Sequence, residues 1–376
     1  RLFREVLEDT KDAVGDKCAV AVRFAVDELL GPKGITCESE GREVVEMLAE
    51  IPDLWDVNIS GWENDSVTSR FEKEGYQETY INFVKSLTTK PVVGVGRYTS
   101  PDTMVSLIKR GVIDMIGAAR PSIADPFLPK KIEEGRIDEI RECIGCNICV
   151  AGDWLAVPIS CTQNPTMGEE WRRGWHPERI EPSNSEDGVL VVGGGPAGLE
   201  CALALGQRGY RVILAEASAE LGGRVSRESK LPGLAEWGRV RDHRVVMLEK
   251  LKNVTFYLGS SLTAEDIFEF SDDDKFGFSH IFLSTGATWR RDGIAREHRE
   301  PIPGLEHVSV LTADDIMDGI SAHGKVVIFD DEHYYMGGVI AEKLRIDGHD
   351  VKLVTPAPDI STWTHNTMEQ GRIQKN

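Results

Sequence analysis

Short runs of β-branched residues alternate with amphipathic stretches over the first 140 residues, and this alternation constrains the fold more than any other feature. The apolar runs are 18–24, 54–59, 91–96 and 112–118, and the stretches 42–50, 80–87 and 102–111 carry apolar residues at helical spacing. Such repeats are typical of βα units on a parallel sheet. The sequence therefore predicts an α/β fold class, with four parallel strands in this part of the chain.

Polar or aromatic side chains follow the ends of these predicted strands. They are Arg23, Trp62 with Asp65, Arg97 and Arg120. In a (β/α)8 barrel, the C-terminal ends of the strands carry the chemistry, and eight strands are needed to close the barrel. We therefore interpret residues 1–140 as the C-terminal half of a (β/α)8 TIM barrel. A solvated rim without a ligand is the alternative for the three arginines.

A glycine-rich turn, 193-GGGPAG-198, links the predicted strand 189–192 to the predicted helix 199–209. Gly193, Gly195 and Gly198 form the pattern G-x-G-x-x-G, and Glu216 ends the next strand, 210–216. These glycines allow a tight turn and close approach of a pyrophosphate to a helix N-terminus, while the acid accepts from ribose hydroxyls. The sequence predicts a Rossmann-like nucleotide site without a 2′-phosphate. A purely structural role of the glycines is the alternative.

A third βαβ unit is predicted from strands 325–330 and 350–355 with helix 339–347, but its first turn reads 330-DDEHYYMGG-338. Asp330, Asp331 and Glu332 would repel a pyrophosphate. We therefore interpret this unit as a degenerate second nucleotide fold and do not expect NAD(P)H to bind there.

Four cysteines lie within nineteen positions, as the triplet Cys143, Cys146 and Cys149 followed by Cys161. Two-residue gaps let three thiolates converge, and the longer loop brings the fourth from another direction. This spacing predicts a [4Fe-4S] cluster, with structural zinc as the alternative. A cluster held by four thiolates passes single electrons, so a flavin is expected beside it to collect them in pairs. We interpret the other cysteines as packing residues.

The charge balance excludes some partners. The chain has 62 acidic and 43 basic side chains, a net charge of −19. This charge disfavours nucleic acid and anionic membranes as partners. With no apolar run of about 18 residues and no signal-like start, we expect a cytoplasmic protein without a membrane segment. Because a helical pattern is under way from Leu2, we expect the sequence to be a piece of a longer chain.

Four segments of the chain resemble the trimethylamine and dimethylamine dehydrogenase family. They are 94-GVGRYTSP-101, 117-GAARPSIADPFLP-129, 143-CIGCNIC-149 and 161-CTQNPTMGEEWRRGWHP-177. The resemblance implies a barrel of the NADH:flavin oxidoreductase, Old Yellow Enzyme-like type that binds FMN, an adjacent [4Fe-4S] cluster, and a domain that holds ADP or FAD. It implies these domains: 1–140, the second half of the barrel; 141–187, cluster segment and linker; 188–320, ADP/FAD-binding; 321–376, the truncated start of the degenerate domain.

The same resemblance assigns residues to the flavin and to the substrate. Arg23 would lie near the flavin N1 and O2, and Gly96, Arg97, Ala119 and Arg120 would hold the phosphate end and the ring edge. Trp62 and Asp65 would face the substrate, with Trp154 as a second aromatic wall. An aromatic face beside a carboxylate suits an amine cation. Asp65 as a simple turn residue is the alternative.

The leading functional hypothesis is an oxidoreductase acting on CH–NH donors. FMN would oxidise a small N-methylated amine, and electrons would pass through the cluster to an electron-transfer flavoprotein, with a homodimer as a candidate assembly. One alternative is an NAD(P)H-dependent enoate or 2,4-dienoyl-CoA reductase. The other is a non-catalytic nucleotide-binding fragment, since the sequence lacks half of the expected flavin site and is expected to be inactive by itself.

Overall fold

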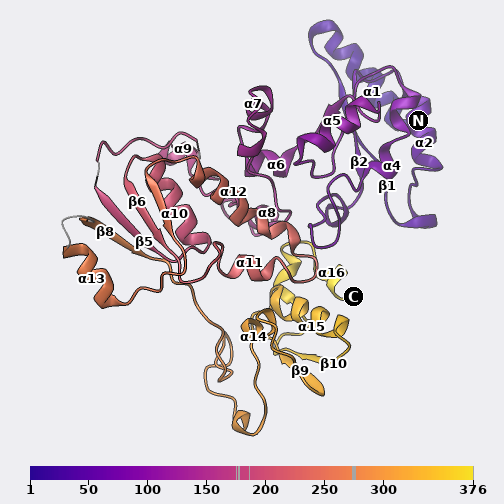
Figure 1. Ribbon diagram of the computed structural model, residues 1–376. Helices are drawn as coiled ribbons and strands as arrows, with labels where there is room; N and C mark the ends of the chain where they lie inside the picture. The colour runs from indigo at the N-terminus through magenta and orange to yellow at the C-terminus, as the bar shows by residue number, and fades with distance from the viewer. Residues whose placement is uncertain (175, 177, 186, 273–276, 376) are drawn as a thin grey trace. The chain divides into compact units, whose positions relative to one another are not determined.

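The structure is a computed structural model that describes residues 1–174, 176, 178–185, 187–272 and 277–375 (Figure 1). Residues 175 and 177, in the family-like segment 161–177, are outside the described residues. So is residue 186, in the polar linker that follows this segment. The chain forms two compact units, Arg1–Ile137 and Asp138–Asn376, which are described separately. Among the described residues, no helix combines the length and the apolar character needed to span a membrane.

The first unit contains a four-stranded parallel sheet. Its strands are β1 (Ala21–Asp27), β2 (Leu54–Ile59), β3 (Val92–Gly94) and β4 (Met115–Ile116), in the order β1-β2-β3-β4. Its helices are α1 (Leu2–Val14), α2 (Glu40–Leu48), α3 (Trp62–Asp65), α4 (Glu78–Ile81), α5 (Pro101–Lys109), α6 (Ala119–Ala124) and α7 (Leu128–Glu133). The prediction of four parallel strands is confirmed, although β4 is much shorter than the apolar run 112–118.

The core of this unit forms where one face of the sheet meets the helices. Trp55, Val57 and Val92 are fully buried, as is Val45 on α2. The Trp55 indole also donates a 3.0 Å hydrogen bond from Nε1 to the carbonyl of Ala49, so its single polar atom is satisfied. This packing fixes the register of β2 and hence the position of the residues that follow it.

The second unit begins with a four-stranded parallel sheet in the order β7-β6-β5-β8. Its strands are β5 (Gly188–Val192), β6 (Arg211–Ala215), β7 (Val254–Tyr257) and β8 (Phe278–Leu283). Helices α10 (Pro196–Gln207) and α12 (Arg239–Glu249) contribute Leu199, Leu203 and Leu248 to a core shared with Val191 and Leu214. The predicted strand, helix and strand around the glycine turn are confirmed.

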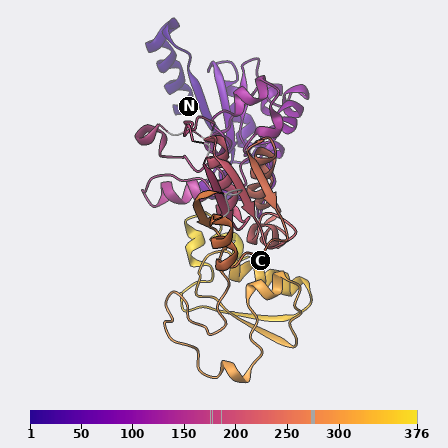
Figure 2. The same ribbon diagram turned by 60° about the vertical axis from the view of Figure 1, so that its left-hand side comes forward.

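A smaller sheet pairs β9 (Lys325–Phe329) with β10 (Asp350–Val354) in parallel. Helix α15 (Met336–Ile346) joins the two strands and lies beside them, in the yellow-orange part of the ribbon (Figure 2). It packs against them through Val339, Ile340 and Leu344. The predicted third βαβ unit is therefore present. The remaining helices of this unit are α8 (Ile148–Trp154), α9 (Glu170–Arg173), α11 (Arg224–Glu228), α13 (Ala264–Asp272), α14 (Ala313–Met317) and α16 (Gln370–Ile373).

Candidate functional site

At two glycines of the turn before α10, a side chain would clash with the backbone. A Cβ on Gly193, whose φ is +103°, would lie 2.3 Å from the carbonyl oxygen of Ser284, and one on Gly198 would lie 1.8 Å from the carbonyl oxygen of Gly193. Gly195 differs, because nothing lies within 4 Å of its Cβ position. It caps the N-terminus of α10. The turn is thus closed on its inner side and open where a pyrophosphate would approach the helix.

Glu216 lies beside this turn, at the end of β6. Its Oε2 accepts a 2.6 Å hydrogen bond from the backbone N–H of Gly194, and its Oε1 accepts a 2.8 Å bond from that of Ser218. Burial raises the pKa of the Glu216 carboxyl. The backbone donors of Ser218 and Gly194 lower the pKa by more than burial raises it, so the net shift is downward. The structure therefore brings a carboxylate with a lowered pKa next to the open turn, where it could accept from ribose hydroxyls.

The four cysteines of the predicted cluster lie in the loop before α8, on α8 itself and in the loop after it. Gly145, with φ of +62°, and Asn147, with φ of +58°, turn the chain between the first three. The Cys146 Sγ lies 3.2 Å from the hydroxyl of Thr162, next to Cys161 in sequence. The two chain segments that carry the thiols therefore meet.

The thiols occupy a buried environment in which they interact electrostatically. Burial raises the pKa of Cys146 to about 12, and charge on Cys143 and Cys161 adds to the increase. Burial also raises the pKa of Cys161, with a further contribution from Cys143. The raised pKa favours the neutral thiol when no metal is bound. A bound metal would favour the thiolate instead, because a coordinating thiol is deprotonated.

The spacing of these sulfurs bears on the two metal alternatives. A tetrahedral zinc ion with Zn–S bonds of about 2.3 Å holds its sulfurs roughly 3.8 Å apart. No three of the four cysteine sulfurs, all of which are described, lie within 4.8 Å of one another. A cluster in which each thiolate binds a different iron allows wider separations. The four cysteines therefore remain candidate ligands for a metal centre, and its identity is taken up with the proposed function.

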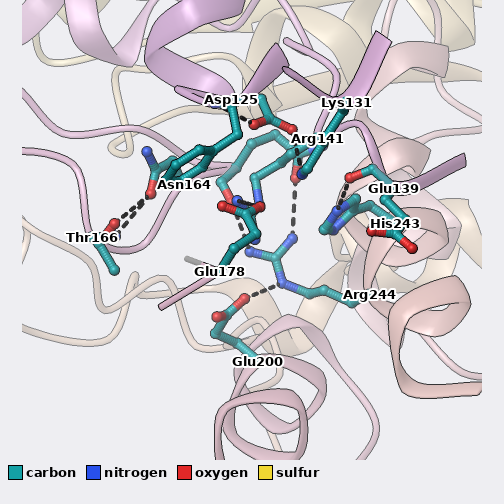
Figure 3. Close-up of polar contacts among 12 residues, drawn as sticks. Asp125, Lys131, Glu139, Arg141, Asn164, Thr166, Glu178, Glu200, His243 and Arg244 are labelled. Atoms are coloured by element: carbon teal, nitrogen blue, oxygen red, sulfur yellow. Dashed lines mark hydrogen bonds and ion pairs between the residues drawn. The ribbon is translucent and has the colours of Figure 1, made fainter. Parts of the chain in front are cut away.

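Figure 3 shows two arginines of the second unit, Arg141 and Arg244, with their acidic partners. Both interact electrostatically with Cys161. Arg141 and Arg244 are only 3% and 4% exposed. The Nε of Arg244 lies 2.7 Å from Glu200, and Arg141 lies 3.7 Å from Glu178. Charge on Arg141 lowers the pKa of Cys161, against the larger effect of burial. Sequence analysis missed both cations, because an arginine in a polar stretch gives no sign of burial.

In the first unit, Arg23 on β1 connects two acids. Its Nη1 lies 2.7 Å from Asp56 on β2, and its Nη2 lies 3.4 Å from Asp65 at the end of α3. The other carboxylate oxygen of Asp65 accepts a 2.8 Å hydrogen bond from the amide of Gln77. Gln77 is fully buried and accepts from the backbone N–H of Ile59, so it ties Asp65 to the end of β2. Sequence analysis missed Gln77.

Trp62 and Asp65 are the first and last residues of α3, a single turn entered through Gly61 at φ of +83°. The indole of Trp62 is 40% exposed. The hydroxyl of Tyr76 donates to the carbonyls of Asn64 and Asp65 and so fixes this turn. An accessible aromatic ring and a carboxylate are therefore presented by one short, rigid element. Trp154, at the end of α8, is exposed and belongs to the second unit.

The other predicted flavin residues lie at the ends of β3 and β4. Arg97 is buried at φ of +57° and donates from Nη2 to the carbonyl of Glu72 at 2.7 Å. The carbonyl of Gly96 accepts from Gly75, whose Cα lies 3.2 Å from where a Cβ on Gly96 would be. Arg120 donates to the carbonyls of Ser66 and Val67, directly after α3, while Ala119, which begins α6, is exposed.

Comparison with protein families gives three successive matches. Residues 1–139 match the NADH:flavin oxidoreductase / NADH oxidase family, and residues 187–328 match the pyridine nucleotide-disulphide oxidoreductase family. Residues 311–376 match the Old Yellow Enzyme-like second alpha/beta domain. The chain thus combines a flavin oxidoreductase part with a pyridine nucleotide-disulphide oxidoreductase part in a mixed α/β fold.

Individual relatives match the chain along its whole length. Dimethylamine dehydrogenase from Hyphomicrobium sp. is 44% identical over 100% of this chain and 52% of its own. Among solved structures, histamine dehydrogenase from Rhizobium sp. 4-9 has 53% identity and a TM-score of 0.95, with 100% of this chain and 54% of its own covered. The 6-hydroxypseudooxynicotine amine oxidase from Pseudomonas geniculata N1 has 54% identity and the same TM-score, with 100% and 56% covered. The chain therefore spans about half the length of the relatives it matches.

Proposed function

The chain belongs to the trimethylamine/dimethylamine dehydrogenase family, and on this premise we propose that the protein of which it is part is a flavin-dependent dehydrogenase of N-methylated amines. Residues 1–140 would be the C-terminal half of its FMN-binding barrel, 141–187 the cluster segment, 188–320 the ADP- or FAD-binding domain and 321–376 the start of the degenerate domain. Homologous amine dehydrogenases support the reaction class.

The strand ends of the first unit fit an FMN. Arg97 would offer a cation to the phosphate end, and the close approach of Gly96 to Gly75 would leave the backbone there accessible. Ala119 and Arg120, in the segment 117–129, would complete the set. Arg23 would provide a positive charge at the ring edge, where it stabilises a reduced flavin. When bound, FMN would supply two-electron oxidation of the C–N bond. The imine product would then be hydrolysed to an aldehyde and the dealkylated amine.

Trp62 and Asp65 would bind and orient the amine. The exposed indole offers a cation–π surface, and the carboxylate, held by Gln77, offers an acceptor for an ammonium proton. Arg23 would balance the charge of Asp65 when no substrate is bound, because their side chains lie 3.4 Å apart. A small amine is therefore the substrate class that fits.

Cys143, Cys146, Cys149 and Cys161 would hold a [4Fe-4S] cluster, which when bound passes electrons singly. The glycine turn and Glu216 would hold ADP or the ADP part of FAD. Electrons would leave to a protein acceptor of the electron-transfer flavoprotein kind. A cytoplasmic homodimer is the assembly we propose.

We propose that electrons flow from the amine to a protein acceptor and not inward from NAD(P)H. The turn before α15 is the single observation that carries this direction. Glu332 accepts hydrogen bonds from the backbone N–H groups of Tyr334 and Met336, and Asp330 accepts from those of Glu332 and His333. A Cβ on Gly337 would lie 2.6 Å from the Asp330 carboxyl carbon. Carboxylates therefore occupy the donors that a dinucleotide pyrophosphate needs. This disfavours NAD(P)H as the electron source.

Anaerobic stopped-flow bleaching of the flavin in the full-length protein tests the proposal. We expect rapid bleaching by methylated amines and none by NADPH or NADH on the same timescale. Rapid reduction by NADPH with amines inert would favour the enoate or dienoyl-CoA reductase alternative. A purified full-length protein that contains no flavin would favour a nucleotide-binding role.

A further inference from the structure

Three side chains outside the proposed redox site converge on one point of the second unit. The imidazole Nε2 of His333, a carboxylate oxygen of Asp331 and one of Glu297 all lie within 4.8 Å of one another. Asp331 and His333 belong to the turn between β9 and α15, and Glu297 lies in the long segment between β8 and α14. The Nε2 of His333 is 3.2 Å from Asp331 Oδ1 and 3.5 Å from Glu297 Oε1.

The two inner atoms are buried and have no hydrogen-bond partner. His333 is 6% exposed and Asp331 is 4% exposed. Among the described residues, neither His333 Nε2 nor Asp331 Oδ1 has a hydrogen-bond partner of good geometry, and the contact between them is the 3.2 Å ion pair. The two atoms can satisfy each other only as an ion pair with a protonated imidazole, whereas a bound cation would satisfy both with the imidazole neutral.

The other polar atom of each side chain, Nδ1 of His333 and Oδ2 of Asp331, already has a hydrogen-bond partner. The Nδ1 of His333 lies 3.2 Å from the hydroxyl of Thr355, and Asp331 Oδ2 accepts from the backbone N–H groups of Glu297 and His298 at 2.7 and 3.2 Å. Such contacts fix the ring orientation and aim the free atom at a metal in known sites. The backbone of His333 is also left-handed, at φ of +64°, a conformation that is uncommon for non-glycine residues.

We propose that Glu297, Asp331 and His333 bind a divalent transition-metal ion of the zinc or manganese type. Ligand atoms at about 2.0–2.2 Å from one ion lie roughly 3–3.5 Å apart, which matches the two measured separations. Two carboxylates and a neutral imidazole neutralise such an ion. The 57% exposed side chain of Glu297 provides an entry path and leaves the other coordination positions to water.

The ion would tie the long segment between β8 and α14 to the turn before α15. Glu297 is 34 residues from Asp331, and the two backbone hydrogen bonds to Asp331 are the contacts that already join them. None of the three ligands is assigned to flavin, cluster or amine, although Asp331 and His333 lie in the turn whose other acids disfavour NAD(P)H. The ion would also give Asp331 a use other than repelling a pyrophosphate.

Titration of the oxidised, cofactor-loaded full-length protein with Mn²⁺ tests the proposal, with free Mn²⁺ measured by electron paramagnetic resonance. Mn²⁺ prefers oxygen ligands and avoids the cysteine thiolates. We expect one saturable site per chain, displacement of Mn²⁺ by Zn²⁺, and at least a tenfold weaker site in Glu297→Gln and His333→Gln. Glu297 is exposed, so its variant should keep the fold, which circular dichroism checks.

His307→Gln is the matched control. His307 Nε2 also lies 3.3 Å from a carboxylate, that of Glu306, but both side chains are exposed and no third ligand joins them. This variant should bind Mn²⁺ like the wild type. The proposal fails if the wild type shows no saturable Mn²⁺ site, or if Glu297→Gln and His333→Gln bind with unchanged affinity.

Discussion

Two glycines of the turn before α10 have opposite surroundings, and the difference separates folding from binding. A methyl group on Gly198 would lie 1.8 Å from a carbonyl oxygen, whereas one on Gly195 would meet nothing within 4 Å. Gly198→Ala should lower the free energy of unfolding by about 3 kcal/mol, because the backbone must move. Gly195→Ala should change it by less than about 0.5 kcal/mol.

ADP binding should be lost in Gly195→Ala despite its stability, because the new methyl group would fill the space in which we expect the pyrophosphate. Chemical denaturation and calorimetric titration with ADP measure the two effects. Undiminished ADP affinity in this variant would show that the open side of the turn does not hold the ligand.

The lowered pKa of Glu216 predicts how the stability of its unit depends on pH. Its folded pKa lies below the ordinary value near 4.5, because the backbone donors of Ser218 and Gly194 outweigh burial. Its ionised form therefore adds stability that is complete above the ordinary pKa and is lost as pH falls through the folded pKa. The Tm difference between wild type and Glu216→Gln should stay constant from about pH 7 to 5.5 and shrink toward pH 3. A difference that grows on acidification would contradict this assignment.

Asp65 is the residue whose charge we expect amine oxidation to need. Asp65→Asn keeps an oxygen that accepts from Gln77 but removes the negative charge, so kcat/KM for the amine should fall about 10²-fold. The FMN content of the full-length protein should not change. Asp56→Asn is the control, because it removes the charge of the closer acidic partner of Arg23 and leaves Asp65 in place. Equal losses of activity and FMN in the Asp65 variant would give Asp65 a structural role.

At the scale of elements, the junction of α6 and α7 contains a fully buried ion pair. Lys131 Nζ lies 2.7 Å from Asp125 Oδ2, and neither side chain is exposed. Lys131→Met removes the cation that lies 2.7 Å from a buried carboxylate, so it should lower the free energy of unfolding by about 3–5 kcal/mol. Arg110→Met, which breaks the exposed Arg110–Glu78 pair, should have little effect. Urea denaturation compares them, and similar losses in both would refute the argument.

The elements that sequence analysis predicted are those whose own residues carry the signal. Strands β5 and β6 are apolar runs, and the glycine turn between them is local, so the βαβ unit and the position of Glu216 follow from spacing alone. The cysteine triplet is equally local. Helix α12, in contrast, is rich in charged residues and buries His243 and Arg244, so tertiary contacts override its polar composition.

Strand β8 shows a second reason for failure. Its residues Phe278–Leu283 include Ser279 and His280, and it pairs with β5 only across some ninety positions of sequence. The link from Gln77 to Asp65 and the meeting of Glu297 with His333 likewise depend on chain segments that only the fold brings together. No local pattern predicts such contacts. From its charge alone, Asp331 was therefore interpreted as a residue that repels a pyrophosphate.

At the scale of the whole molecule, the cysteine site and the glycine turn lie within one compact unit, Asp138–Asn376, yet share no residue. Removing one thiol should therefore abolish the cluster and leave nucleotide binding intact, as for separate sites whose effects add. Cys146→Ser in anaerobically purified full-length protein should lose its iron and the brown cluster absorbance and still bind ADP with wild-type affinity. Cys18→Ser, which changes an exposed cysteine outside this unit, should retain both. Zinc instead of iron in the wild type would overturn the cluster assignment, and loss of ADP binding in Cys146→Ser would show that the two sites depend on each other.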